Sequence, residues 1–158
     1  MKLALALALA HRPALLILDE PTAGLDPVAR REFLDLIASQ ARNHGRTTFF
    51  STHLIDEVER VADRVGIIDR GRMRYEGSVA DLRAEVKRVR TEPGGTPPLP
   101  GPEFQLLRDE SVAGSSTLVF RAPATAWTTV QFEPSVRVEE MSLEDIFLAF
   151  AAAARVEL

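Results

Sequence analysis

The sequence predicts an α/β protein with a smaller α+β part at its C-terminal end. Three observations predict it: strand-like apolar runs alternate with helix patterns up to residue 90, a segment rich in proline and glycine follows, and short alternating segments then precede a last helix pattern. Strands that alternate with helices are typical of a parallel sheet with flanking helices. We therefore expect a first part at residues 1–90, a linker at 91–102 and a C-terminal extension at 103–158.

The composition is that of an ordinary globular protein. Of the 158 residues, 46% are hydrophobic and 27% are charged, which excludes disorder throughout the chain. The net charge of -4 provides no general basic field, so we expect no nucleic-acid partner. Cysteine is absent, which excludes disulfides and thiolate metal sites and suits a reducing cytoplasm.

The start of the chain allows two interpretations. Residues 3–10 contain only Leu and Ala, which are strong helix formers, and apolar residues on all sides are typical of a buried helix. The same run after Lys2, with its Ala-x-Ala pattern, also resembles a secretory signal. Cleavage near Ala10 would leave the next apolar run without a packing partner, so we prefer the helix. No apolar run approaches the roughly 18 to 20 residues of a membrane span.

A strand and a long helix are expected next. Residues 14–18 form a short apolar run that ends at Asp19, the pattern of a strand buried in a parallel sheet. Asp26 can cap the following helix, Pro27 suits its first turn, and Gly45 can end it. The inward face of this helix is marked by apolar side chains at helical spacing, namely Phe33, Leu34, Ile37, Ala38 and Ala41.

The rest of the first part repeats this alternation. The expected elements are a strand at 47–51, a helix at 54–63, a strand at 65–69, a hairpin return at 72–77 and a helix at 79–89. Arg70 and Gly71 supply the hairpin turn, and Ser78 with Asp81 three residues later begins the last helix. The basic run at residues 87–90 is then expected at a solvated helix end.

The linker and the extension have different patterns. Residues 91–102 hold five of the ten prolines and three of the nine glycines, so they cannot continue a helix or lie inside a sheet. Short alternating segments follow at 103–109, 116–122, 128–133 and 136–140. A helix begun by Ser142 then extends to residue 156.

Acidic side chains follow the first strand at a position suited to phosphate chemistry. Asp19 can hold Mg²⁺ through a water molecule, and the adjacent Glu20 can orient or deprotonate a water that attacks a phosphate. Gly24 permits a turn that brings Asp26 to the surface, where a second copy of the protein could contact it. His53 follows the second strand, where it either donates a hydrogen bond to a phosphate oxygen or is a histidine without a functional role.

Two strings together carry a resemblance to a known family. LLILDEPTAGLDP at residues 15–27, followed by FFSTH at 49–53, resembles the second half of the ATP-binding subunit of ABC transporters, over about residues 3–86. The resemblance implies a partial P-loop NTPase fold: a parallel sheet with flanking helices whose Walker A strand is missing. The extension, with SLEDIFLAF near its end, is similar to extensions in ATPase subunits of bacterial exporters of the drug or antibiotic type.

The resemblance also implies roles for single residues. Asp19 and Glu20 would be the Walker B acids, residues 23–26 the D-loop at a dimer interface, and His53 the histidine that contacts the γ-phosphate. ATP and Mg²⁺ are the implied cofactors. A second ATPase subunit and a membrane permease are the implied partners, which would place the chain at the cytoplasmic face of the membrane.

Other motifs of the family do not occur in these 158 residues: the G-x-x-x-x-G-K-[ST] loop, the Q-loop and the LSGGQ-like signature. Met1 therefore resembles an internal methionine of a longer protein. Each lost charge-assisted bond to phosphate is worth about 1.5 to 3 kcal/mol, so affinity should fall at least roughly 10³-fold. We expect no ATP hydrolysis by this chain alone.

Two alternatives to an ATPase fragment remain open. The chain could be an interaction module that binds a full-length ATPase or the permease, or, if residues 3–10 are a signal, a small secreted protein. In the family, the Walker A strand lies between the strands expected here at 47–51 and 65–69. Both strands would then have an unpaired edge, and such edges promote association with other chains.

Overall fold

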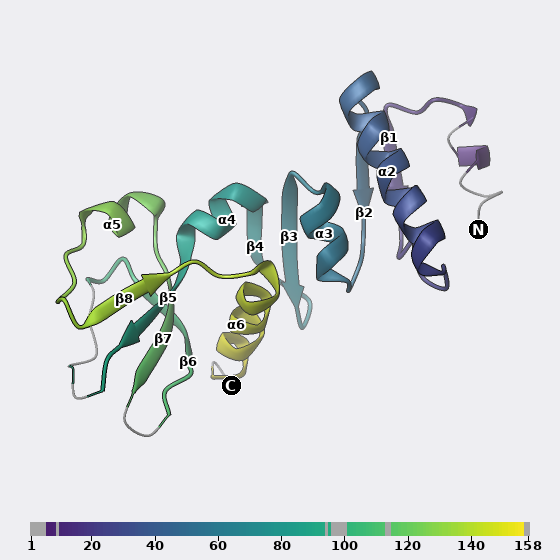
Figure 1. The fold of residues 1–158 in the computed structure, drawn as a ribbon. Coiled ribbons are helices and arrows are strands. Elements are labelled where there is room, and N and C mark those ends of the chain that lie inside the picture. The colour runs from purple at the N-terminus through teal and green to yellow at the C-terminus, as the bar shows by residue number, and fades with distance from the viewer. Residues whose placement is uncertain (1–5, 9, 94, 96–100, 113–114, 157–158) are drawn as a thin grey trace. The chain divides into compact units, whose positions relative to one another are not determined.

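A computed structural model describes residues 6–8, 10–93, 95, 101–112 and 115–156 (Figure 1). The chain forms two compact units, Met1–Ala62 and Asp63–Leu158, and we describe each by itself. In the first unit, residues 6–8 and 10 are helical, in agreement with the helix predicted at 3–10, of which the other residues lie outside the described ones. Leu7 is 59% exposed, so this helix is not buried on all sides as predicted.

The first unit is built on a two-stranded parallel sheet. Strands β1 (Leu15–Leu18) and β2 (Thr47–Phe50) pair in parallel, and helix α2 (Pro27–His44) connects them (Figure 1). A second helix, α3 (Ile55–Val61), follows β2. The strand, helix, strand and helix predicted for this segment are thereby confirmed. Gly45 ends α2 with a φ of 61°, a left-handed conformation that favours glycine.

One face of the parallel sheet is covered and the other is open. Phe33, Leu34 and Ile37 of α2 are buried, and Leu18 and Phe50 pack against them. On the opposite face the strands expose Leu15, Ile17 and Phe49, which are 52%, 69% and 66% exposed. The prediction that residues 14–18 are fully buried is therefore wrong for one face, because α2 packs on the other.

The second unit begins with an antiparallel hairpin. Strands β3 (Arg64–Asp69) and β4 (Arg72–Ser78) pair through the turn at Arg70 and Gly71, whose φ values are 49° and 74°. Positive φ at both central residues is typical of the tight turns that connect hairpin strands. The predicted hairpin is confirmed. The third predicted strand is β3, and it pairs with β4.

The helix predicted at 79–89 is shorter than expected. Helix α4 (Val79–Glu85) begins at Ser78, whose hydroxyl accepts a hydrogen bond from the Asp81 N–H at 2.9 Å, and it ends where strand β5 (Val86–Thr91) begins. The basic residues 87–90 therefore lie in a strand and not at a solvated helix end. The reason is tertiary pairing: β5 has hydrogen-bonded neighbours on both sides, and this outweighs the local helix preference.

A four-stranded antiparallel sheet forms the centre of the second unit. Its strand order is β6 (Gln105–Asp109), β7 (Ser116–Arg121), β5 and β8 (Val136–Glu139). Helix α5 (Ala124–Thr129) replaces part of the alternating segment predicted at 128–133, and helix α6 (Leu143–Val156) confirms the last predicted helix. The sheet joins β5 to strands that follow the predicted linker. Part of that linker, residues 94 and 96–100, lies outside the described residues, and the predicted boundaries at 90 and 102 stay predictions.

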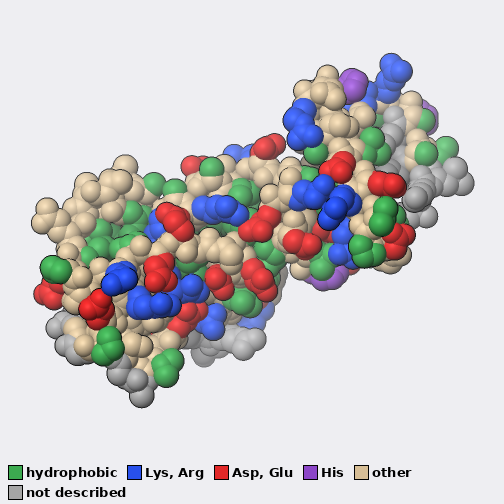
Figure 2. Space-filling model, viewed as in Figure 1, with side chains coloured by type: hydrophobic (Ala, Val, Ile, Leu, Met, Phe, Trp, Pro, Cys, Tyr) green, Lys and Arg blue, Asp and Glu red, His purple; other side chains and the backbone are tan. Residues whose placement is uncertain are grey.

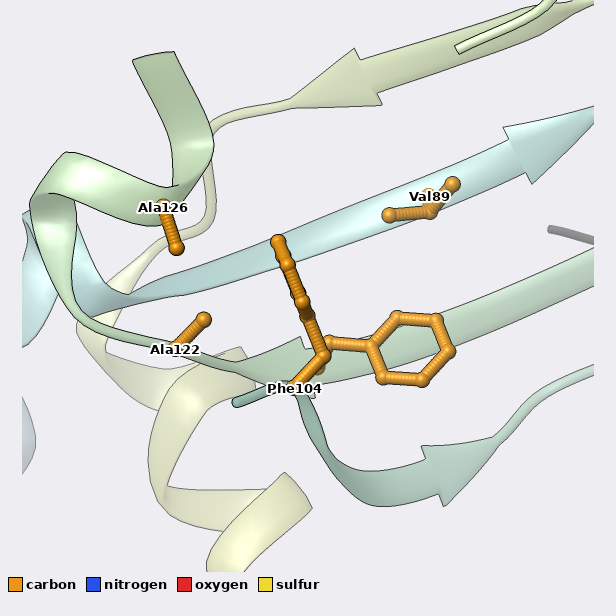
Figure 3. Packing of buried hydrophobic residues seen from close by; sticks show 5 residues of the cluster. Val89, Phe104, Ala122 and Ala126 are labelled. Carbon is orange, nitrogen blue, oxygen red and sulfur yellow. The ribbon is translucent and has the colours of Figure 1, made fainter. Parts of the chain in front are cut away.

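The core of this sheet combines aromatic with small apolar side chains (Figure 3). The ring of Phe104 meets those of Phe120 and Trp127 edge to face, with centroid distances of 6.4 and 4.9 Å. The indole N–H of Trp127 donates to the Glu85 carbonyl at 2.9 Å, which satisfies its one donor and ties α5 to the end of α4. On the face of this unit that Figure 2 shows, acidic and basic side chains lie interspersed. Ion pairs in the unit include Arg121 with Glu85 at 3.0 Å.

The one tyrosine, Tyr75, gives a pH-dependent prediction. It is 4% exposed, and burial raises its pKa above the ordinary value of 10.0, while the nearby Glu85 and Asp81 raise it further. Since the folded state favours the neutral phenol, this contribution to stability is complete below pH 10 and is lost as the pH rises through the folded-state pKa. Absorbance at the tyrosinate band should titrate at higher pH in the native chain than in the urea-unfolded one; coincident curves would contradict the burial.

Candidate functional site

The carboxyl ends of β1 and β2 bring polar residues to one edge of the parallel sheet. Asp19 and Glu20 follow β1, and Ser51 follows β2, with its N–H bonded to the Leu18 carbonyl at 3.0 Å. The Ser51 hydroxyl donates to Oδ1 of Asp19 at 2.5 Å and accepts from the N–H of Glu20 at 2.9 Å. One hydroxyl therefore fixes the carboxyl group of one acid and the backbone of the next.

The backbone at Glu20 is unusual. Its φ is 39°, in the left-handed region that a residue with a side chain adopts at a cost of about 1 to 2 kcal/mol. Its carbonyl accepts from the Ala23 N–H at 3.0 Å and so closes a turn directly after the strand. This conformation directs Glu20 away from the regular strand path. Strain of this kind occurs often at functional sites.

His53 lies beside Glu20. Its Nδ1 is 3.1 Å from Oε1 of Glu20, and the two side chains are 71% and 49% exposed. An acid and an imidazole within hydrogen-bond distance are suited to proton transfer and to hydrogen bonding of a phosphate oxygen. The structure thus brings together Asp19, Glu20 and His53, three of the residues singled out from the sequence.

The Asp19 carboxylate is suited to a magnesium ion whose other ligands are mostly water and phosphate oxygens. Mg²⁺ prefers oxygen ligands and is usually held by one or two carboxylates, with water and phosphate oxygens completing the octahedron. Asp19 offers an exposed carboxyl group at the strand end, and the Ser51 hydroxyl oxygen lies next to it. Within the described part of the chain, no group of three or more His, Cys, Asp or Glu side chains is placed to hold a metal by itself.

Gly24 and Asp26 lie in the segment that connects β1 to α2. Gly24 has a φ of 74°, and a Cβ built there meets no atom within 4 Å, so the turn needs glycine for its backbone and not for lack of space. Asp26 is exposed and acts as the N-cap of α2, with Oδ1 accepting from the N–H groups of Val28 and Ala29 at 3.0 Å each. The predicted cap is confirmed.

The cap predicts a difference between two substitutions. Asp26→Ala should lower the free energy of unfolding by about 1 kcal/mol, because two N–H groups of the first turn lose their acceptor. Asp26→Asn keeps an acceptor oxygen and should lower the free energy of unfolding by no more than roughly a few tenths of a kcal/mol. Urea unfolding followed by circular dichroism measures both. Equal losses for the two variants would show that the charge, and not the cap, stabilises the helix.

Four residues around the site are not among those singled out from the sequence: Arg30, Ser51, Thr52 and Glu57. Ser51 could have been found, since a hydroxyl at the end of a strand next to a strand ending in acids is placed to bond with them. Glu57 could not, because an acid in the first turn of a helix is expected to face water. In the structure its side chain is instead fully buried.

A family of known proteins matches the part of the chain that carries this site. Residues 2–58 match the sequence model of a family described as "AAA domain, putative AbiEii toxin, Type IV TA system". The matched segment contains β1, α2 and β2 and ends in α3. It therefore covers the acids after β1 and the histidine after β2.

Several named relatives are ATP-binding proteins of ABC transporters. The bacitracin transport ATP-binding protein BcrA of Bacillus licheniformis is 49% identical over 72 residues, which are 46% of this chain and 24% of the relative. The energy-coupling factor transporter ATP-binding protein EcfA2 of Symbiobacterium thermophilum is 47% identical over 91 residues, 56% of this chain and 31% of the relative. The linearmycin resistance ATP-binding protein LnrL of Bacillus subtilis (strain 168) is 45% identical over 75 residues, which are 48% of this chain and 24% of the relative.

The chain spans between about a quarter and a third of the length of these curated relatives. Its mixed α/β architecture, with a parallel strand pair, agrees with a P-loop ATPase of this class. About half of its residues align with the relatives at 45% to 49% identity. The resemblance of this chain to the ATP-binding subunits of ABC transporters is thereby confirmed.

Proposed function

We propose that this chain supplies the magnesium-holding and water-activating part of an ABC transporter's ATP-binding subunit. The observation that carries the proposal is the Ser51 hydroxyl, which joins Asp19 to the backbone of Glu20 at the edge where His53 also lies. An arrangement that only kept the protein soluble would not require a shared hydrogen-bond partner between two adjacent acids. The similarity to ATP-binding proteins of ABC transporters supports the same function.

The residues take separate roles in this proposal. Asp19 would hold Mg²⁺ through a water molecule, and bound Mg²⁺ would offset the charge that develops on the phosphate oxygens. Glu20 accepts a proton from the attacking water or orients it. His53 donates a hydrogen bond to the terminal phosphate, and its Nδ1 lies within hydrogen-bond distance of the Glu20 carboxyl group. Gly24 and Asp26 present the D-loop turn to a second ATPase subunit.

The partners of the whole protein follow from the relatives and are likewise proposals. A relative named for bacitracin transport and one named for linearmycin resistance both support an exporter of the drug or antibiotic type. Such a subunit would act on a membrane permease at the cytoplasmic face, with ATP held between two ATPase subunits. In the described residues, no helix is both long enough and apolar enough to cross a membrane.

Hydrolysis by this chain alone is not part of the proposal. The 158 residues contain no G-x-x-x-x-G-K-[ST] string, so the main grip on the phosphates has to come from another segment. The experiment compares the chain with a fusion in which the segment that precedes the matched region of the bacitracin transport protein is joined to the first matched residue of this chain. The fusion should release phosphate from MgATP, and the chain alone should release no more than its Glu20→Gln variant.

Two outcomes would contradict these expectations. Phosphate release by the unfused chain above that of Glu20→Gln would show that the missing loop is not needed. A fusion that folds and binds ATP, yet leaves the nucleotide intact, would show that Asp19 and Glu20 are not placed for hydrolysis.

A second candidate function is an interaction module, and the open face of the parallel sheet favours it. Leu15, Ile17 and Phe49 are each more than half exposed on adjacent strands of one face. An apolar patch of this kind is typical of a surface that contacts another polypeptide. The module would use this face to bind a full-length ATPase subunit.

The open face predicts self-association of the isolated chain. Sedimentation velocity should show a mass that rises with protein concentration, and the Ile17→Thr/Phe49→Thr double variant should remove most of this rise. Val28→Thr is the matched control, because Val28 is 68% exposed but lies on α2. A chain that stays monomeric at all concentrations, or an equal effect of Val28→Thr, would contradict the role of this face.

A further inference from the structure

Glu57 is a buried acid with no role in the proposed chemistry. It lies in the first turn of α3, and 0% of its side chain is exposed. A buried acid is destabilising unless its oxygens are paired and hydrogen-bonded. One oxygen, Oε2, accepts from the Thr52 hydroxyl at 2.7 Å, and the other, Oε1, lies 3.6 Å from Nε of Arg30. These two contacts connect Glu57 to the loop that follows β2 and to helix α2.

Thr52 connects Glu57 to the turn that carries His53. The Thr52 hydroxyl accepts a hydrogen bond from the Leu54 N–H at 3.1 Å while it donates to Glu57. A hydroxyl bonded to the N–H two residues further on closes a local turn around the residue between them. That residue is His53, so the backbone on both sides of the histidine is fixed by a single hydroxyl group.

Arg30 connects Glu57 to the helix that follows Asp26. The backbone N–H of Arg30 donates to the Asp26 carbonyl at 2.9 Å, so Arg30 lies one helical turn after the cap. Nε of Arg30 and Oε1 of Glu57 are both buried, and among the described residues neither atom has a hydrogen-bond partner. The polar contact of each atom is therefore the ion pair with the other. The charge of Arg30 thus compensates the buried acid.

The His53 side chain itself has little packing to hold it. It is 71% exposed, and its contact with the Glu20 carboxyl group at 3.1 Å is made in solvent. Contacts between exposed groups are weak, with a typical strength of about 0 to 1 kcal/mol. The position of the imidazole therefore depends on the backbone turn beneath it, which Thr52 and Glu57 fix.

We propose that Glu57 is a positioning residue: through the Thr52 hydroxyl it fixes the turn that presents His53 to Glu20, and through Arg30 it ties this turn to the helix capped by Asp26. Its effect on hydrolysis rests on the proposed function. Its effect on the contact between His53 and Glu20 does not, and can be measured in the chain without nucleotide.

The experiment measures that contact by NMR. Ring signals of the three histidines are recorded in the 158-residue chain, and His53→Gln identifies those of His53. Glu20→Gln should shift the His53 signals, and this shift should fall at least about twofold in the Thr52→Val and Glu57→Gln backgrounds. Thr52→Ser keeps the hydroxyl and should keep the shift. Asp56→Asn removes a charge from the exposed side of the same turn and should also keep it.

Three results would overturn the proposal: an unchanged shift in the Thr52→Val background, a loss of the shift in Asp56→Asn, or no rescue by Thr52→Ser. If Glu57→Gln fails to fold, as circular dichroism would show, Thr52→Val decides alone, because valine keeps the shape of threonine without its hydroxyl. A fusion without ATPase activity whose His53 shift behaves as expected would contradict only the proposed function.

Discussion

Glu20→Gln is expected to lower ATP hydrolysis by the fused protein about 10²- to 10⁴-fold, the range by which a positioned general base accelerates a reaction. Glutamine keeps the size of the side chain and the left-handed backbone turn, but it cannot take a proton from water. The Michaelis constant for ATP should change much less than the turnover rate, because the phosphate grip lies elsewhere. Steady-state phosphate release measures both quantities.

The matched control for this prediction is Glu144→Gln. Glu144 is exposed in the first turn of α6, so its replacement makes the same chemical change in the second unit. It should leave the turnover rate unchanged. A Glu20→Gln variant with the turnover of the parent fusion would show that another group activates the water.

Arg30→Ala is expected to lower the free energy of unfolding of the first unit by about 3 kcal/mol, the lower end of the range for breaking a buried ion pair. The lower end applies because the Arg30 side chain is 32% exposed, while that of Glu57 is completely buried. Alanine leaves the buried acid without its compensating charge. Urea unfolding followed by circular dichroism at the helix band measures the loss.

Arg31→Ala provides the control, since the neighbouring Arg31 is exposed on the same helix. It should change the stability by no more than about 0.5 kcal/mol. The Arg30→Met/Glu57→Leu double variant, which removes both charges, should recover much of the loss. Equal losses for Arg30→Ala and Arg31→Ala would mean that the pair contributes nothing specific.

The sequence predicts elements well where their signals are local. Helix α2 carries its own cap at Asp26, a proline in its first turn and a glycine at its end, and the structure follows all three signals. The hairpin turn at Arg70 and Gly71 is equally local. The main residues of the candidate site can also be predicted from local signals, because an acid pair after one strand and a histidine after the next are located from the strand ends alone.

The errors occur where distant segments decide the structure. Val86 and Val89 lie in a stretch with a helical pattern, but they belong to strand β5, and both are 0% exposed. Val86 pairs with β7, and Val89 pairs with both β7 and β8. The hydrogen bond between Ser51 and Asp19 joins residues 32 positions apart, and the burial of Glu57 depends on a side chain of another helix. No local pattern contains that information.

The most direct test of the central claim is a crystal structure of the fused protein with Glu20→Gln, which would trap unhydrolysed ATP and magnesium. In this structure Asp19 should lie within one water molecule of the metal, and residue 20 and His53 should both face the terminal phosphate. If these three side chains lie away from the terminal phosphate while the nucleotide is bound, the claim that they form a hydrolytic site is wrong.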